Sequence, residues 1–176
     1  MTIQAGTYKL GPDNASLHVE TGRSGAAAKA GHDLIIDVTS WEATLEVGDS
    51  SSLSLTADPS SLRVREGKGG MQALKDDDKD DIHKTIDKDV LKKKDISFQS
   101  SSVEPAGDGL KVSGDLELGG KSQPITFDVN ESGGTLTGSA RLNQSDWGIK
   151  PYSALFGALK VNDEVEVVVE GNVPTA

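Results

Sequence analysis

Apolar and polar residues alternate with a period of two through most of the sequence, and this pattern limits the folds open to the chain. Between positions 110 and 118 every even-numbered residue is apolar or glycine, whereas the odd-numbered residues are polar. Successive side chains of a β-strand point to opposite faces, so this pattern predicts a strand with one buried and one solvated face. The same alternation recurs at 17–21, 53–58, 96–99, 125–130, 136–142 and 164–170.

The spacing of these strands indicates one all-β domain over residues 1–176. Roughly eight or more short strands, separated by Gly, Pro, Asn and Asp turns, are typical of an antiparallel barrel or sandwich. Gly119-Gly120-Lys121-Ser122 joins two of them in the manner of a hairpin. Between Leu34 and Val47 the apolar residues change from even to odd positions, which predicts a bulge or bend near Ser40.

Two segments depart from the strand pattern. Residues 71–94 contain no Gly or Pro, and their apolar residues Leu74, Ile82, Ile86 and Val90 are spaced by multiples of four. This spacing predicts a helix with a narrow apolar stripe, laid along one rim or mouth of the barrel. A short helical turn is expected near 151–159, because Pro151 suits the first helical position.

The charge balance excludes several classes of partner. The formal net charge is −10, with 28 acidic and 18 basic residues, which opposes binding to nucleic acid or to anionic membranes. The sequence has no run of 18 apolar residues, and its start lacks the basic head and apolar core of a signal peptide. We therefore expect a cytoplasmic protein without an integral membrane segment, as a monomer or homodimer.

The sequence offers little for catalysis or metal binding. It has no cysteine, and His18, His32 and His83 lack the close spacing of a metal site. The acidic run 76–81 resembles a calcium loop, but Asp81 stands at the required glycine and Asp87 at the final glutamate. Hydrolase, kinase and dehydrogenase motifs are absent from the sequence. We expect no catalytic residue, no metal and no obligatory cofactor, although an enzyme using His32 with a carboxylate is an alternative.

The predicted interior favours a bound guest. A barrel of about eight strands is either filled by its own side chains or holds one small ligand. Several inward positions are small, and the chain has only seven aromatic residues: three Phe, two Trp and two Tyr. Neighbouring Leu and Val side chains could equally close the gap. The small inward residues are Ala43, Ala57, Gly114, Gly138 and Ala140.

Several segments together resemble the YceI-like family of lipocalin-like, polyisoprenoid-binding proteins. The resemblance covers nearly the whole chain and is carried by 6–10, 15–19, 96–100, 112–120, 123–125 and 161–167. The segments Gly31-His32-Asp33-Leu34 and 146–152 are similar to one branch of the family, and His18 or Val19 stands where better-known members have a Phe. The resemblance implies an extended, eight-stranded antiparallel barrel, a helix near its opening and a long isoprenoid chain, such as a quinone tail, inside.

These observations lead to a set of functional hypotheses. The first is binding, storage or transport of a polyisoprenoid, isoprenoid quinone or similar lipid inside the barrel. The alternative is a packed barrel that acts as a protein-interaction or stress-related module. Trp147, Tyr152 and His32 are expected to meet a polar head group at the mouth. The predicted ligand-binding residues are Leu17, Val19, His32, Leu34, Ile36, Trp41, Phe98, Val112, Gly114, Phe127, Gly138, Ala140, Trp147, Tyr152, Leu155 and Phe156.

Overall fold

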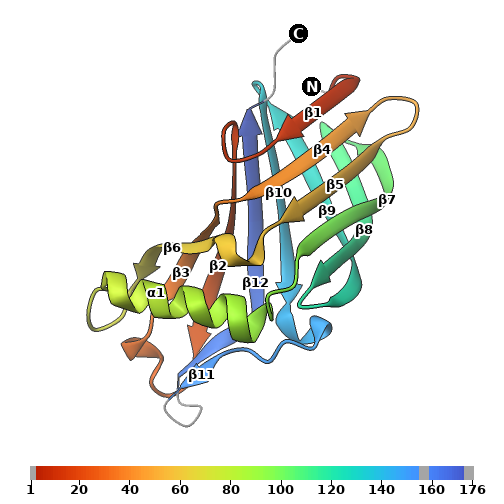
Figure 1. Ribbon diagram of the computed structural model, residues 1–176. Helices are drawn as coiled ribbons and strands as arrows, with labels where there is room; N and C mark the ends of the chain where they lie inside the picture. Colours follow the sequence, from red (N-terminus) through yellow and green to blue (C-terminus); the bar gives the residue numbers. More distant parts are fainter. Residues whose placement is uncertain (1–2, 155–158, 173–176) are drawn as a thin grey trace.

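The computed structural model describes residues 3–154 and 159–172, and most of them lie in one antiparallel sheet. The sheet has twelve strands in the order β1-β4-β5-β7-β8-β9-β10-β12-β2-β3-β6, with β11 paired to β12 beside this path. It curls around a central axis, as Figure 1 shows. The predicted all-β, lipocalin-like fold is confirmed. The strands are β1 (Gly6–Leu10), β2 (Ala15–Ser24), β3 (Asp33–Val38), β4 (Trp41–Val47), β5 (Ser52–Ala57), β6 (Leu62–Lys68), β7 (Ile96–Ala106), β8 (Gly109–Leu118), β9 (Lys121–Ser132), β10 (Thr135–Asn143), β11 (Ser153–Ala154) and β12 (Leu159–Asn172).

The number of strands exceeds the predicted eight because long strands bend. Strands β3 and β4 follow each other directly, and β3 pairs with β6 while β4 pairs with β5. Backbone hydrogen bonds continue across the bend, from Thr39 N to Ser61 O at 2.9 Å and from Asp58 N to Ser40 O at 3.0 Å. The segments 33–47 and 52–68 therefore form one bent hairpin. This confirms the bend predicted near Ser40.

The turn between β8 and β9 is the hairpin that the sequence predicts at Gly119-Gly120. Leu118 pairs with Lys121, so Gly119 and Gly120 form a two-residue loop. Their φ angles are +57° and +86°, in the left-handed region that a side chain disfavours and glycine accepts. The predicted connection is confirmed.

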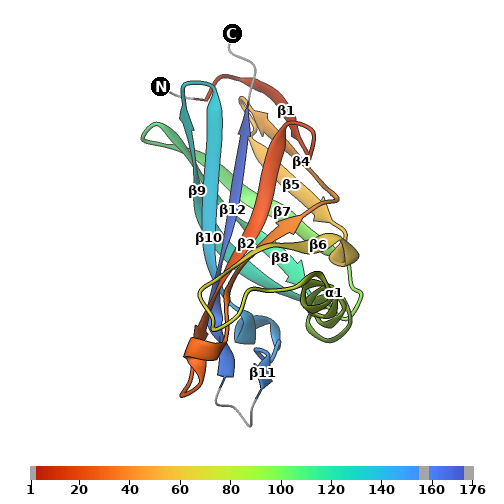
Figure 2. The ribbon, with the colours of Figure 1, turned by 90° about the vertical axis from the view of Figure 1, so that its left-hand side faces the viewer.

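The helix is shorter than the 71–94 predicted. Helix α1 spans Asp76–Thr85 and continues into a π-helical stretch η3 at Ile86–Val90. Its start is fixed by Asp78, whose Oδ2 accepts a 3.0 Å hydrogen bond from Lys75 N. Its end is fixed by Lys92 and Lys93, which adopt left-handed φ angles of 55° and 57°. Figures 1 and 2 show α1 lying near the lower end of the sheet, below β6.

The helical turn predicted at 151–159 is wrong for the residues that the structure describes. Ser153 and Ala154 form β11 and pair with Lys160 and Leu159, while residues 155–158 lie outside the described residues. The Val161 amide also donates a 2.9 Å hydrogen bond to Tyr152 O. Pairing with β12 satisfies these backbone groups and overrides the helical signal of Pro151. Short 3-10 turns lie at η1 (Ala28–Ala30), η2 (Pro59–Ser61) and η4 (Gln144–Trp147).

Candidate functional site: an apolar cavity inside the curled sheet

The inward faces of the strands surround a cavity of about 510 Å³. Its lining is predominantly apolar. The three inward valines of β12, Val165, Val167 and Val169, pack against the hydrophobic core but are only partly buried, because part of each side chain borders this space. A cavity of this volume lies within the range of small-molecule binding sites. The protein's own side chains therefore do not completely fill the space enclosed by the inward apolar faces that the period-two pattern predicts.

The cavity extends along the strands. On β12 its lining runs from Lys160 to Gly171, and on the neighbouring β10 from Leu136 to Leu142. With a rise of roughly 3.3 Å per strand residue, the β12 wall corresponds to a length on the order of 35 Å. The shape is that of a long channel, which suits an extended molecule better than a compact one.

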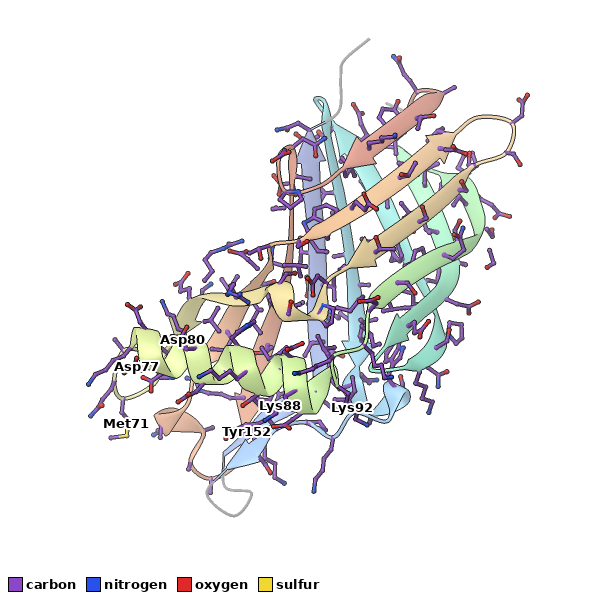
Figure 3. The ribbon with its side chains drawn as sticks, in the orientation of Figure 1. Met71, Asp77, Asp80, Lys88, Lys92 and Tyr152 are labelled. Atoms are coloured by element: carbon purple, nitrogen blue, oxygen red, sulfur yellow. The ribbon has the colours of Figure 1, made fainter. Side chains whose placement is uncertain are left out.

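Polar side chains gather at one end of this channel. Thr21, Arg23, Gln144, Tyr152 and Lys160 line the cavity where β2 ends and β12 begins, close to η4 and β11. Figure 3 places Tyr152 below α1 at this lower end. The opposite end is lined by Leu10, Ala43, Leu45, Leu136 and Gly171. The channel is therefore amphipathic, with a polar mouth and an apolar interior.

The polar mouth is held in place by contacts with neighbouring segments. Arg23 Nη1 lies 3.3 Å from Asp33 Oδ1 and donates a 3.0 Å hydrogen bond to Lys68 O. His32 Nε2 lies 2.6 Å from Gln72 O, and the Gln144 amide donates a 3.0 Å hydrogen bond to Asn162 O. Within residues 3–154 and 159–172, no carboxylate side chain lines the cavity, so its charged lining residues are basic.

The helix supplies one wall of the channel. Leu74, Ile82, Ile86 and Val90, the stripe predicted from the sequence, all line the cavity. No residue of α1 or η3 is buried. The stripe therefore covers the channel, and its residues Ile86 and Val90 remain only partly buried although they also pack against the hydrophobic core.

Ten of the predicted ligand-binding residues line this cavity. Nine come from strands or from the turn before β3, and Tyr152 stands at the mouth. Trp41, Val112, Gly114 and Trp147 do not line it, while Leu155 and Phe156 lie outside the described residues. The residues that line it are Leu17, Val19, His32, Leu34, Ile36, Phe98, Phe127, Gly138, Ala140 and Tyr152.

The four that lie away from the cavity are packed into the protein. Val112 is 0% exposed, and Trp41 is 6% exposed with an indole N–H that has no partner in the structure. A Cβ at Gly114 would collide with the Gln99 carbonyl oxygen and come within 2.7 Å of Phe98 Cζ, so the glycine makes room for the backbone of β7 and for a ring of the protein itself. Trp147 is 4% exposed and donates a 2.8 Å hydrogen bond to Leu116 O. Its indole anchors η4 to β8 and does not face the mouth.

Part of the lining was not among the residues predicted from the sequence. Leu53, Leu55, Leu142, Val165 and Val167 line the cavity and lie on the apolar face of alternating strands, so the period-two signal could have selected them. Arg23 and Lys160 had no comparable signal. In a sequence, a charged residue at the mouth of a channel looks like any other exposed charged residue, because the difference depends on where the strands lie in the fold.

Titratable groups with displaced pKa values lie outside the channel. Hydrogen bonds from the Ser60 hydroxyl and amide lower the pKa of Asp58, which caps η2. Hydrogen bonds to Asp37 raise the pKa of Arg65 on β6. Neither residue lines the cavity. In the part of the chain that the structure describes, no cluster of three His, Asp or Glu side chains could hold a metal ion, and no helix is long and apolar enough to cross a membrane.

Comparisons with known proteins agree with this architecture. A model of the YceI-like domain matches residues 8–173. The crystal structure of Burkholderia cenocepacia BcnA is similar, with a TM-score of 0.63, 18% identity, and coverage of 89% of this chain and 94% of that one. A Campylobacter jejuni YCEI protein is similar with a TM-score of 0.54, 16% identity, and coverage of 80% and 85%. Curated protein sequences give no significant match.

Proposed function

The chain belongs to the YceI-like family, and we propose that it binds, stores or carries a long apolar molecule, such as a polyisoprenoid, an isoprenoid quinone or a similar lipid, inside its cavity. The observation that carries this proposal is the apolar channel of about 510 Å³. Transfer of apolar ligand surface from water into this channel would contribute about 25 cal/mol per Å². Such burial needs no directional contact along the chain of the ligand.

The polar end of the channel supports an orientation for the ligand. The apolar tail would lie along the inward faces of β10 and β12, while a polar head group would meet Arg23, Gln144 and Lys160 at the mouth. These side chains can donate hydrogen bonds, so they favour a head group with acceptor oxygens. Tyr152, which is 55% exposed, would contact the head group from the outer side.

The two alternative functions have less support. A packed barrel acting only through its outer surface would be expected to fill its interior, in contrast to the channel seen here. An enzyme using His32 would need a partner to position and charge the ring. Among the described residues, the hydrogen bond that His32 makes is to the Gln72 carbonyl and not to a carboxylate.

Ligand uptake by two variants of one strand tests the proposal. Ala140 points into the cavity and Thr137, also on β10, is exposed and does not line it. A140F fills the channel, whereas T137F adds the same ring to the outside. After delipidation, uptake of an isoprenoid quinone is measured by equilibrium binding. We expect A140F to bind at least about tenfold more weakly and T137F to bind like the unmodified protein. Equal uptake by folded A140F would contradict binding in this channel.

A further inference from the structure

The two ends of the channel differ in their exposure to solvent. At the polar mouth, Tyr152 is 55% exposed and the Lys160 side chain is also exposed. At the opposite end, Leu45 and Leu136 are 2% and 3% exposed, although both line the cavity. The channel is therefore open at the mouth and closed at the other end.

Leu10 helps to close the far end by reaching across it. This residue belongs to β1, which pairs with β4, whereas Gly171 lies on β12. A Cβ at Gly171 would lie 2.9 Å from Ala15 Cβ and 3.1 Å from Leu10 Cδ2, so the glycine makes room for both side chains. Leu136 is paired with Gly171 in the register of β10 with β12. We define the end wall as Leu10, Leu45, Leu136 and Gly171, all of which line the cavity.

The protein behind the end wall is packed. Ile3 and Leu110 are buried members of the hydrophobic core, and neither lines the cavity. Leu110 is paired with the cavity residue Val129 in the register of β8 with β9. Interiors of this kind are close-packed, so a tail that reaches the end wall has no further space to enter unless buried side chains move.

Small residues keep the channel open between the mouth and the end wall. Gly138 and Ala140 lie on the cavity face of β10. A Cβ at Gly138 would come within 3.2 Å of Val169 Cγ1, so a larger residue there would crowd the cavity face of β12. From Lys160 to Gly171, this face of β12 has a length on the order of 35 Å. The channel therefore has a defined length.

The chemistry of the two ends determines which end of a ligand enters first. The end wall consists of leucine and glycine in paired strands, so its side chains offer no hydrogen bond. A polar head group buried there would lose its hydrogen bonds to water without replacing them. Arg23, Gln144 and Lys160 offer donors at the mouth. An amphipathic ligand therefore enters tail first and keeps its head group at the mouth.

We infer that the end wall sets the length of the apolar tail that the channel accepts, with Leu10 as the residue that fixes the limit. This length limit rests on the proposed function, because it specifies which members of one ligand class bind. Each added isoprene unit removes more apolar surface from water until the tail reaches the end wall. A longer tail leaves part of its chain outside, or separates its head group from Arg23, Gln144 and Lys160. The protein therefore prefers one tail length over shorter and longer ones.

Competition between quinones of different tail length tests the length limit. Delipidated protein is incubated with an equimolar mixture of isoprenoid quinones that share one head group and differ only in the number of isoprene units. The bound quinones are then extracted and quantified by mass spectrometry. We expect one intermediate tail length to be enriched by at least about tenfold over tails that are several units shorter or longer.

Two substitutions should move the preferred tail length in opposite directions. L10A removes the side chain that crosses the far end, so the preference should shift to longer tails. A43L enlarges a cavity residue that is paired with Leu10, so the preference should shift to shorter tails. L110A is the matched control, because it makes the same change at a buried leucine that does not line the cavity. It should lower stability and keep the tail preference of the unmodified protein.

The possible outcomes separate the length limit from the proposed function. Either L10A or A43L is sufficient if only one of them folds, because each predicts a shift in its own direction. Equal binding of all tail lengths, or folded variants with the preference of the unmodified protein, would overturn the length limit and leave the proposed function intact. Failure of the unmodified protein to bind any tail length would contradict the proposed function and the length limit with it.

Discussion

The indole Nε1 of Trp147 donates a 2.8 Å hydrogen bond to the backbone carbonyl oxygen of Leu116, and the indole is 4% exposed. This contact attaches η4 to β8 beside the polar mouth. The segment is also held by Ser145, whose amide and hydroxyl bond to Asp163, and by Gln123, whose amide donates to Asp146 O at 2.8 Å. The end of the channel is therefore built on a rigid support.

W147F should destabilise the protein by about 1–3 kcal/mol, because the buried Leu116 carbonyl loses its donor. Denaturant unfolding followed by circular dichroism measures the change. Y152F, at a residue that is 55% exposed, is the control and should change stability by less than about 0.5 kcal/mol. Equal stability of W147F and the parent would show that the indole is not a structural anchor.

Two valines allow a comparison of the packed core with the channel wall. Val112 is 0% exposed and does not line the cavity, whereas Val167 is partly buried and does. V112A should cost about 2–3 kcal/mol, since it leaves a void, and V167A should cost less than about 1.5 kcal/mol in ligand-free protein. Urea midpoints of the two variants give the comparison. If V167A were as costly as V112A, the channel would be filled in solution.

The lowered pKa of Asp58 predicts that the stability of the protein depends on pH. Hydrogen bonds from Ser60 lower its pKa in the folded protein below the ordinary 3.8. A carboxylate with a lowered folded pKa stabilises the fold above its unfolded pKa, and this contribution is lost as the pH falls through the folded pKa. D58N, which keeps a capping side chain, should be slightly less stable than the parent at neutral pH. The free energies of unfolding of D58N and the parent should become equal at a pH below 3.8. Urea unfolding along a pH series measures the difference between them. A constant difference would rule out the charge as its source.

Local patterns were sufficient to predict much of the fold. The alternation in 110–118, the Gly119-Gly120 turn and the phase change near Ser40 each specify backbone direction within a few residues, and the structure confirms all three. The predicted C-terminal boundary of the helix was wrong because Lys92 and Lys93 adopt left-handed φ angles, which lysine side chains do not indicate in a sequence. The start was wrong because Asp78 caps the helix at Lys75. The helical turn predicted at Ser153 and Ala154 was wrong because pairing with β12 determines the conformation of these two residues.

The candidate site could be predicted only in part. Val19, Phe127 and Ala140 share the inward phase of their strands and line the cavity as that phase implies. Phase alone does not show how far along the strand the channel extends, so Val112 and Gly114 were grouped with them although the β7 backbone at Gln99 and the Phe98 ring fill the space beside Gly114. The basic mouth arises from Arg23 and Lys160, which are distant in sequence and meet only through the pairing of β2 with β12.

Native mass spectrometry of the purified protein, followed by organic extraction of what it carries, tests directly whether the channel holds a long apolar molecule. Binding in the channel predicts a stoichiometric adduct, or one that forms on incubation with isoprenoid quinones or prenols, and its loss in A140F but not in T137F. A protein mass without adduct that persists after incubation with these lipids would contradict it.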